Sequence, residues 1–246
     1  MPSLYGLIGY PLSHSFSPAY FRKKFTEKRI EADYRSFPLK DLKELKPLLK
    51  QNPDLVGINV TIPYKEAILP LLHDIDIVAL GIGAVNCIAI EEGILKGYNT
   101  DAIGFKQSLI PLLLTQHTNA LVLGTGGSSK AVKYILQKLG IPYQSVSRKD
   151  GKGYLAYHQI DEELMATHKL IINTTPLGMY PKAHECPPIP YHLIGRQHLL
   201  YDLIYNPEVT QFLKLGAENG AAIKNGFEML QIQAEASWDI WQSQRL

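Results

Sequence analysis

Residues 120–140 read ALVLGTGGSSKAVKYILQKLG: an apolar run, three glycines and an amphipathic stretch. The apolar run predicts a short buried strand and the later stretch predicts a helix, so Gly124, Gly126 and Gly127 occupy the turn between them. Glycines in such a turn let backbone N–H groups approach a pyrophosphate, whose charge the helix N-terminus favours. Ser129 stands at the third fingerprint position, where Gly or Ala is usual, so a purely structural turn stays open. We expect a dinucleotide-binding α/β domain here.

The segment VSRKDGK follows the next predicted strand, over residues 143–147. An acidic side chain about 20 residues after the glycines would bind a ribose 2′-hydroxyl. Ser147, Arg148 and Lys149 stand there instead, and a guanidinium and an ammonium match a 2′-phosphate better than a carboxylate does. We therefore predict NADP rather than NAD. A solvated basic turn and a displaced ribose acid at Asp150 remain the alternatives.

Short β-branched runs alternate with longer amphipathic ones on both sides of this turn, which predicts α/β domains with largely parallel sheets. Predicted strands cover 4–8, 34–37, 56–61, 120–123, 143–147, 170–173, 199–204 and 221–223, and strands 85–90 and 94–98 form a hairpin with a three-residue loop. Predicted helices cover 18–29, 39–50, 64–72, 75–80, 102–114 and 227–244. The last of these carries an apolar stripe of Phe227, Leu230, Ala234, Trp238 and Trp241.

Polar residues follow the strands of the first hundred residues, where α/β sheets place their ligands. In GYPLSHSFSP, residues 9–18, Ser17 is the expected N-cap before Pro18. Alternatively, Ser15 and Ser17 bind a substrate carboxylate with the help of the helix dipole. His14 between them reads as structural.

Two further segments carry charge. In NVTIPYKE, residues 59–66, Lys65 falls in the first turn of a predicted helix, where the dipole repels a cation. The hairpin brings Asn86 to the same end of the sheet as Asp101, although each has a structural alternative, Asn86 in a turn and Asp101 as a helix cap. A ketone that receives a hydride becomes an alkoxide, which needs a proton donor or cation. Lys65 with Asp101 supplies that pair without a metal.

Composition excludes several classes of protein. The 246 residues include 25 Lys and Arg against 23 Asp and Glu, a net charge of +2 with no basic patch for nucleic acid. Cys87 and Cys186 are far apart in sequence and support neither a disulfide framework nor a metal site, and His184 beside Cys186 lacks a third ligand. The longest apolar run, 77–85, is too short to span a membrane. We expect a cytoplasmic protein.

The chain resembles the shikimate dehydrogenase family over nearly its whole length. The matching motifs, in order, are GYPLSHSFSP, NVTIPYKE, GAVN, YNTDAIG, GTGGSSKAV, INTTPLGM, YDLIYNP and NGFEMLQIQA. The resemblance implies two α/β domains around a cleft. A substrate domain with a mixed, mostly parallel sheet covers 1–100 plus 225–246, and a Rossmann-type NADP domain covers 101–224.

The resemblance also implies reversible NADPH-dependent reduction of 3-dehydroshikimate to shikimate, in the synthesis of chorismate and the aromatic amino acids. It makes Lys65 and Asp101 the catalytic pair and assigns the other residues as follows. Substrate contacts are Ser15, Ser17, Thr61, Asn86, Tyr205 and Gln233, and cofactor contacts are Gly124, Gly126, Gly127, Ser147, Arg148, Lys149, Thr174 and Gly226.

Two other functions are alternatives to this one. A quinate or shikimate dehydrogenase that uses NAD would need room for an extra hydroxyl beside Ser15 and Ser17. A ligand sensor on the same fold would need neither Lys65 nor Asp101, so the retention of both favours an enzyme. The expected partner is a small-molecule substrate, and we expect a monomer or homodimer with no nucleic-acid or membrane partner.

Overall fold

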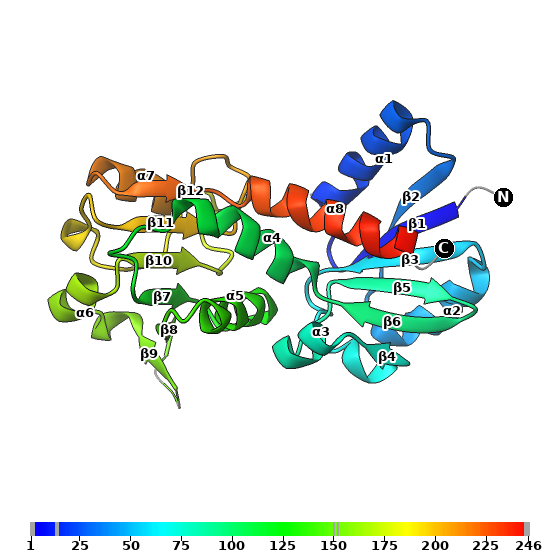
Figure 1. Cartoon of the computed structure of the whole chain (residues 1–246), viewed down its shortest axis with the longest axis horizontal. Coiled ribbons are helices and arrows are strands. Elements are labelled where there is room, and N and C mark those ends of the chain that lie inside the picture. Colours follow the sequence, from blue (N-terminus) through cyan, green and yellow to red (C-terminus); the bar gives the residue numbers. More distant parts are fainter. Residues whose placement is uncertain (1–2, 13–14, 150, 152, 244–246) are drawn as a thin grey trace. The chain divides into compact units, whose positions relative to one another are not determined.

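The computed structural model describes residues 3–12, 15–149, 151 and 153–243. The chain forms two compact units, Met1–Ile103 with Gln233–Leu246, and Gly104–Ile232. It passes between them within helix α4 (Thr100–Leu109) and helix α8 (Phe227–Ser243). Each unit is an α/β structure built on one sheet of six strands, as the alternating pattern predicts (Figure 1).

The sheet of the first unit is mixed. Its strand order is β2-β1-β3-β5-β6-β4, and the neighbours β2/β1, β1/β3 and β6/β4 are parallel whereas β3/β5 and β5/β6 are antiparallel. The strands are β1 (Ser3–Gly9), β2 (Ala32–Pro38), β3 (Leu55–Val60), β4 (Asp74–Ile75), β5 (Cys87–Glu91) and β6 (Ile94–Tyr98). The helices are α1 (Phe16–Lys28), α2 (Leu45–Gln51) and α3 (Ile77–Ile82), with 3-10 turns at Leu42–Glu44 and Leu69–Leu71.

Strand β1 is buried on both faces, as expected of a strand inside a parallel region. Leu4 and Ile8 belong to one apolar cluster, whereas Tyr5 belongs to the other. Trp241 of α8 lies in that second cluster, where its indole N–H donates to the carbonyl of Ile88 at 3.0 Å. The later part of the predicted stripe, Ala234, Trp238 and Trp241, therefore packs into the core of the first unit, whereas Phe227 at its start is exposed.

Two local predictions are wrong. The hairpin loop contains two residues, not three, because Glu91 pairs with Ile94 and both Glu92 and Gly93 have positive φ, 48° and 80°. That pair of dihedrals is the primed turn that matches strand twist. Residues 64–72 form a series of turns rather than a helix, and the first regular piece is the 3-10 turn Leu69–Leu71.

The sheet of the second unit is wholly parallel, in the order β12-β11-β10-β7-β8-β9. Counted from the first strand of the unit, this is the order 6-5-4-1-2-3 of dinucleotide-binding folds, with the reversal between β7 and β10. The strands are β7 (Ala120–Leu123), β8 (Tyr143–Ser147), β9 (Tyr154–Ala156), β10 (Leu170–Asn173), β11 (Leu199–Asp202) and β12 (Ala222–Lys224). Helices α5 (Gly127–Lys138), α6 (Glu162–Thr167) and α7 (Gln211–Glu218) and the 3-10 turns Ile110–Leu112, Tyr157–Gln159 and Tyr191–Leu193 complete the unit.

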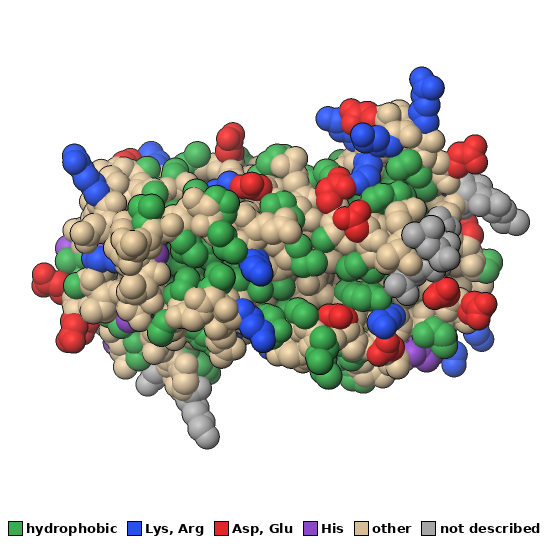
Figure 2. Space-filling view, in the orientation of Figure 1, with side chains coloured by type: hydrophobic (Ala, Val, Ile, Leu, Met, Phe, Trp, Pro, Cys, Tyr) green, Lys and Arg blue, Asp and Glu red, His purple; other side chains and the backbone are tan. Residues whose placement is uncertain are grey.

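The sequence prediction missed β4, β9 and α6, which are only two, three and six residues long, and also the eight-residue helix α7. In the part of the chain that is described, no helix is both long and apolar enough to cross a membrane. Charged side chains of both signs are interspersed over the face shown in Figure 2, in keeping with the net charge of +2.

Candidate active site

Lys65 lies in the turns that follow β3, not in a helix. In a helix its carbonyl would accept from the N–H of residue 69, but it accepts instead from Val85 at 2.7 Å, and the Leu69 N–H bonds to Glu66 at 3.2 Å. Pro70, which has no N–H, further disfavours a helix across this segment. The prediction of a helix here is therefore wrong, and no helix dipole acts on the Lys65 ammonium. What holds the residue is a bond to the segment just before β5.

Lys65 and Asp101 form a buried ion pair. Lys65 Nζ donates to Asp101 Oδ2 at 2.6 Å, and the two side chains are only 14% and 8% exposed. Asp101 sits in the first turn of α4, where its charge is favoured. It does not cap that helix, because Asn99 accepts from the Ala102 N–H. A buried pair contributes little net stability, so its position calls for a chemical explanation.

The Lys65 ammonium has N–H donors that Asp101 does not use. An ammonium has three N–H donors, and Asp101 is the one hydrogen-bond partner of Lys65 Nζ among the described residues. Two donors are thus available to an oxygen placed beside the pair. The second oxygen of Asp101 accepts from Asn86 Nδ2 at 2.9 Å, so both carboxylate oxygens are held.

Asn86 joins this pair to α8. Its amide also donates to Thr100 Oγ1 at 3.0 Å and to Gln233 Oε1 at 3.3 Å, and its Oδ1 accepts from the Thr100 N–H at 2.6 Å. Asn86 therefore both fixes the start of α4 and contacts Asp101. As expected from the hairpin, Asn86 and Asp101 meet at one end of the sheet. The structure brings together Lys65, Asp101, Asn86 and Gln233 in one hydrogen-bonded group.

Ser15, not Ser17, is the N-cap of α1, since the helix begins at Phe16. Proline lacks only an N–H that the first turn leaves unpaired, so Pro18 fits the third helical position as well as the first. Among the described residues, the Ser15 hydroxyl makes no capping bond. Ser17 is buried, and burial raises the pKa of Tyr34 while a hydrogen bond between Tyr34 and Ser17 opposes that rise.

Thr61 follows β3 directly. Its N–H donates to the carbonyl of Ile8 at 2.9 Å, and its methyl group lies where a side chain on Gly9 would be. The backbone of Thr61 thus belongs to the carboxyl end of the sheet, where β1 and β3 finish together. His14 lies outside the described residues.

The glycine-rich turn has the features that a pyrophosphate site requires. Gly124 has a φ of 107°, and a Cβ there would meet Thr174 Oγ1 at 2.6 Å. A Cβ on Gly126 would meet nothing within 4 Å, so the turn has open space on that side. Gly126 is also the N-cap of α5 and offers the first-turn amides no side-chain partner. These residues fit a phosphate group.

Ser129 fits the third fingerprint position despite its hydroxyl. It is fully buried, and its Oγ donates to the carbonyl of Gly126 at 2.7 Å, so the buried polar atom is satisfied. Thr174 follows β10 and donates to the carbonyl of Leu123 at 2.7 Å. The ends of β7 and β10 therefore meet at the strand-order reversal, where such sheets bind their ligands.

The remaining predicted site residues of the second unit differ in how far they are exposed and in what they contact. Ser147 ends β8, and Arg148 and Lys149 after it are exposed, whereas Asp150 lies outside the described residues. Gly226 has a packing reason of its own, since a Cβ there would lie 2.1 Å from the carbonyl oxygen of Leu203. Tyr205 is half-buried, and burial raises its pKa.

Comparison with known proteins decides the family. Residues 7–88 match the model for the shikimate dehydrogenase substrate binding domain. A shikimate dehydrogenase (NADP(+)) from Clostridium beijerinckii is 40% identical over 98% of this chain and 93% of its own. The chain belongs to the shikimate dehydrogenase family. The solved shikimate dehydrogenase of Aquifex aeolicus is 35% identical, with a TM-score of 0.87 over 98% of this chain and 92% of its own.

Another solved member of the shikimate dehydrogenase family is the Thermus thermophilus enzyme in complex with NADP(H) and shikimate. It is 29% identical, with a TM-score of 0.86 over 98% of this chain and 94% of its own. The family therefore includes a member of this fold that was solved with both compounds bound.

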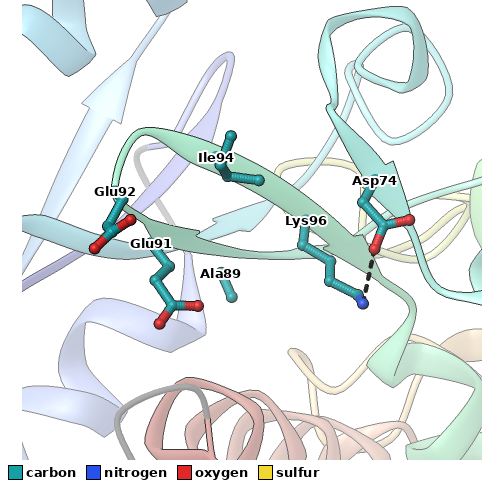
Figure 3. Close-up of a pocket in the computed structure, with 6 residues that line it drawn as sticks. All are labelled: Asp74, Ala89, Glu91, Glu92, Ile94 and Lys96. Atoms are coloured by element: carbon teal, nitrogen blue, oxygen red, sulfur yellow. Dashed lines mark ion pairs between the residues drawn. The ribbon is translucent and has the colours of Figure 1, made fainter.

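One surface pocket, of about 180 Å³, has no part in this group. It is lined by Ala89, Glu91, Glu92, Ile94 and Lys96 on the hairpin and by Asp74 on β4 (Figure 3). The Lys96–Asp74 ion pair spans 2.7 Å between half-exposed side chains and is worth little. Within the described residues, no group of three or more His, Cys, Asp or Glu is placed to hold a metal ion.

Three residues in the hydrogen-bonded group of the first unit were not predicted from the sequence: Asn59, Thr100 and Ser237. Asn59 and Thr100 lie inside motifs already singled out, and Ser237 lies one helical turn beyond Gln233. That spacing was a usable signal, since residues four apart share a helix face.

Proposed function

We propose that this protein is a shikimate dehydrogenase that reversibly reduces 3-dehydroshikimate to shikimate with NADPH. The observation that carries the proposal is the buried Lys65–Asp101 pair, held to Asn86 in a chain of the shikimate dehydrogenase family. A pair with spare ammonium donors suits a ketone oxygen that gains negative charge.

The first unit, with the end of α8, is the proposed substrate domain, and the second unit is the proposed NADP domain. The open turn at Gly126 and the uncapped first turn of α5 would hold the pyrophosphate, with Gly124, Gly127, Thr174 and Gly226 around it. Ser147, Arg148 and Lys149 would hold the 2′-phosphate, whose charge suits exposed cations. NADPH supplies a hydride to the carbonyl carbon.

Lys65 acts on the other atom of that carbonyl. One of its spare N–H groups donates to the oxygen and stabilises the alkoxide that forms. Asp101 holds the ammonium in place through Oδ2 and is itself held by Asn86 through Oδ1. In the reverse direction, the same pair binds the hydroxyl group of shikimate that is oxidised to the carbonyl.

The substrate carboxylate needs hydroxyl donors, and Ser15 and Ser17 at the start of α1 supply them beside the positive end of the helix dipole. Thr61, Asn86, Gln233 and Tyr205 are assigned to the ring hydroxyls. We further propose that the enzyme is cytoplasmic and that it is a monomer or homodimer. Light scattering after size exclusion tests the oligomeric state.

Initial rates at 340 nm test the activity, with shikimate and quinate each paired with NADP and NAD. We expect the highest kcat/KM for shikimate with NADP. A preference for quinate with NAD would refute the assigned substrate and cofactor, and no rate with any pair would favour a ligand sensor.

A further inference from the structure

Ser237 lies at the centre of the hydrogen bonds that surround the proposed substrate residues. It is 0% exposed and one helical turn from Gln233 on α8. Its Oγ donates to the carbonyl of Gln233 at 2.9 Å. The same atom lies 3.0 Å from Asn59 Nδ2 and 3.1 Å from Thr100 Oγ1.

The single hydroxyl proton of Ser237 fixes the direction of these bonds. Because that proton goes to the Gln233 carbonyl, Ser237 Oγ can only accept from its other neighbours. Asn59 Nδ2 is a donor in any case, and its Oδ1 accepts from the Tyr34 hydroxyl at 2.8 Å. Ser237 Oγ is therefore an acceptor for the Thr100 proton, and at 3.1 Å it is nearer than the two others in reach, Asn86 Oδ1 at 3.2 Å and Gln233 Oε1 at 3.3 Å.

The consequence reaches Asn86 and Gln233. With its proton on Ser237, Thr100 Oγ1 turns its lone pairs toward Asn86 Nδ2, which donates to it at 3.0 Å. Asn86 thus directs its NH₂ group at Thr100 Oγ1 and Asp101 Oδ1 and its oxygen at the Thr100 N–H. Gln233 Oε1 lies against this NH₂ group at 3.3 Å. Its own NH₂ group makes no hydrogen bond within the described part of the chain and is left for a ligand.

We propose that Ser237 is a positioning residue, which accepts the Thr100 proton, keeps Thr100 Oγ1 as an acceptor for Asn86 and so holds the side chains of Asn86 and Gln233 in place for the ring hydroxyls of the substrate. It touches neither the substrate nor the Lys65–Asp101 pair. This inference rests on the proposed function, because shikimate is the ligand that those amides are assigned to hold.

Without the Ser237 hydroxyl, the Thr100 proton would turn to Asn86 Oδ1 or Gln233 Oε1, which lie 3.2 Å and 3.3 Å away. Asn86 Nδ2 would then lose Thr100 as an acceptor, and the Asn86 side chain would be held only by Asp101 Oδ1, the Thr100 N–H and Gln233, so Asn86 and Gln233 would be less firmly placed. Substrate binding should weaken, whereas the ion pair that acts on the carbonyl should be unchanged.

Ser237→Ala tests this with Ser108→Ala as the matched control. Ser108 is 1% exposed and also donates to the carbonyl four residues earlier, Gly104 at 2.7 Å, but it lies in the second unit and contacts Tyr201 instead. Calorimetry with shikimate alone should show Kd raised roughly threefold to tenfold in S237A, about the effect of one net hydrogen bond, and unchanged in S108A. KM for shikimate should follow Kd, with kcat within about twofold of wild type.

Thr100→Val provides a second test that does not depend on the folding of S237A. It removes the hydroxyl but keeps the backbone N–H that holds Asn86, and it should raise Kd by a similar factor. The Kd of the double variant for shikimate should be about the same as that of either single variant, because both substitutions break the same chain of bonds. Multiplied effects, or equal changes in S237A and S108A, would overturn the inference alone. Wild-type protein that does not bind shikimate would instead overturn the proposed function together with the inference.

Discussion

Asp202 is a buried carboxylate with no cation beside it among the described residues, and its ionisation should be visible in the stability of the second unit. It ends β11 and is 0% exposed. It accepts from the Thr210 hydroxyl at 2.6 Å, from Asn173 Nδ2 at 3.0 Å and from the Ile204 N–H at 3.0 Å. Burial raises the pKa of this carboxyl to about 7, although the three hydrogen bonds act in the opposite direction.

The sign of the pH effect follows from the raised pKa. Between pH 4 and 7 the unfolded chain has lost this proton whereas the folded chain keeps it, so the folded state binds more protons and stability falls as pH rises. Relative to an unfolded pKa of about 3.9, ionisation between pH 5 and pH 8 lowers the free energy of unfolding by roughly 2 to 3 kcal/mol. Below pH 4 the contribution is complete, and above pH 7 it is lost.

Asp202→Asn removes the titration while keeping an oxygen for Asn173 and Ile204, and its NH₂ group can donate to Thr210. Urea denaturation should show that the free energy of unfolding of the variant, relative to wild type, is roughly 2 to 3 kcal/mol higher at pH 8 than at pH 5. Asp74→Asn is the control, because Lys96 lowers the pKa of the Asp74 carboxyl and any effect there has the opposite sign. A constant difference between D202N and wild type at the two pH values would refute the reasoning.

Three further predictions concern the cofactor and the packing. Arg148→Glu should raise KM for NADPH by about tenfold or more and leave KM for shikimate unchanged, since it places a carboxylate against the proposed 2′-phosphate; an unchanged KM for NADPH would remove Arg148 from the cofactor site. Gly226→Ala should lower the thermal midpoint whether or not cofactor is present, because its Cβ would lie 2.1 Å from the backbone oxygen of Leu203; a full-stability variant would contradict this. Gly57→Ala should cost about 1 to 3 kcal/mol and change the tryptophan fluorescence, because its Cβ would lie 2.5 Å from Trp241 Nε1.

The features that were predictable from sequence are those that local chemistry dictates. The turn at Gly124 could be foreseen because a strand, a glycine pattern and a helix follow each other within about 20 residues. The meeting of Asn86 with Asp101 could be foreseen because a hairpin returns the chain to its origin. Its loop length was misjudged, because the two-residue turn needs a positive φ at Glu92, which is uncommon for a residue other than glycine.

Long-range hydrogen bonds account for what could not be predicted. Residues around Lys65 have a helical pattern, but the carbonyl that would continue a helix is bonded to Val85, twenty positions away. The spacing of Ser237 from Gln233 indicates a shared helix face but not the role of Ser237, since its partners Asn59 and Thr100 come from two other segments of the chain. Periodicity records which face of an element is buried, not which polar group it meets there.

The central claim is that Lys65 acts on the reacting carbonyl, and kcat of Lys65→Ala tests it most directly. Lys24→Ala is the matched control, because Lys24 is also paired with a carboxylate, that of Glu235, and is 13% exposed against 14% for Lys65. With shikimate and NADP, kcat of K65A should fall by about a thousandfold with KM for shikimate within a few-fold of wild type, and K24A should keep its rate. A K65A variant that keeps kcat and only raises KM would contradict the claim and make Lys65 a binding residue.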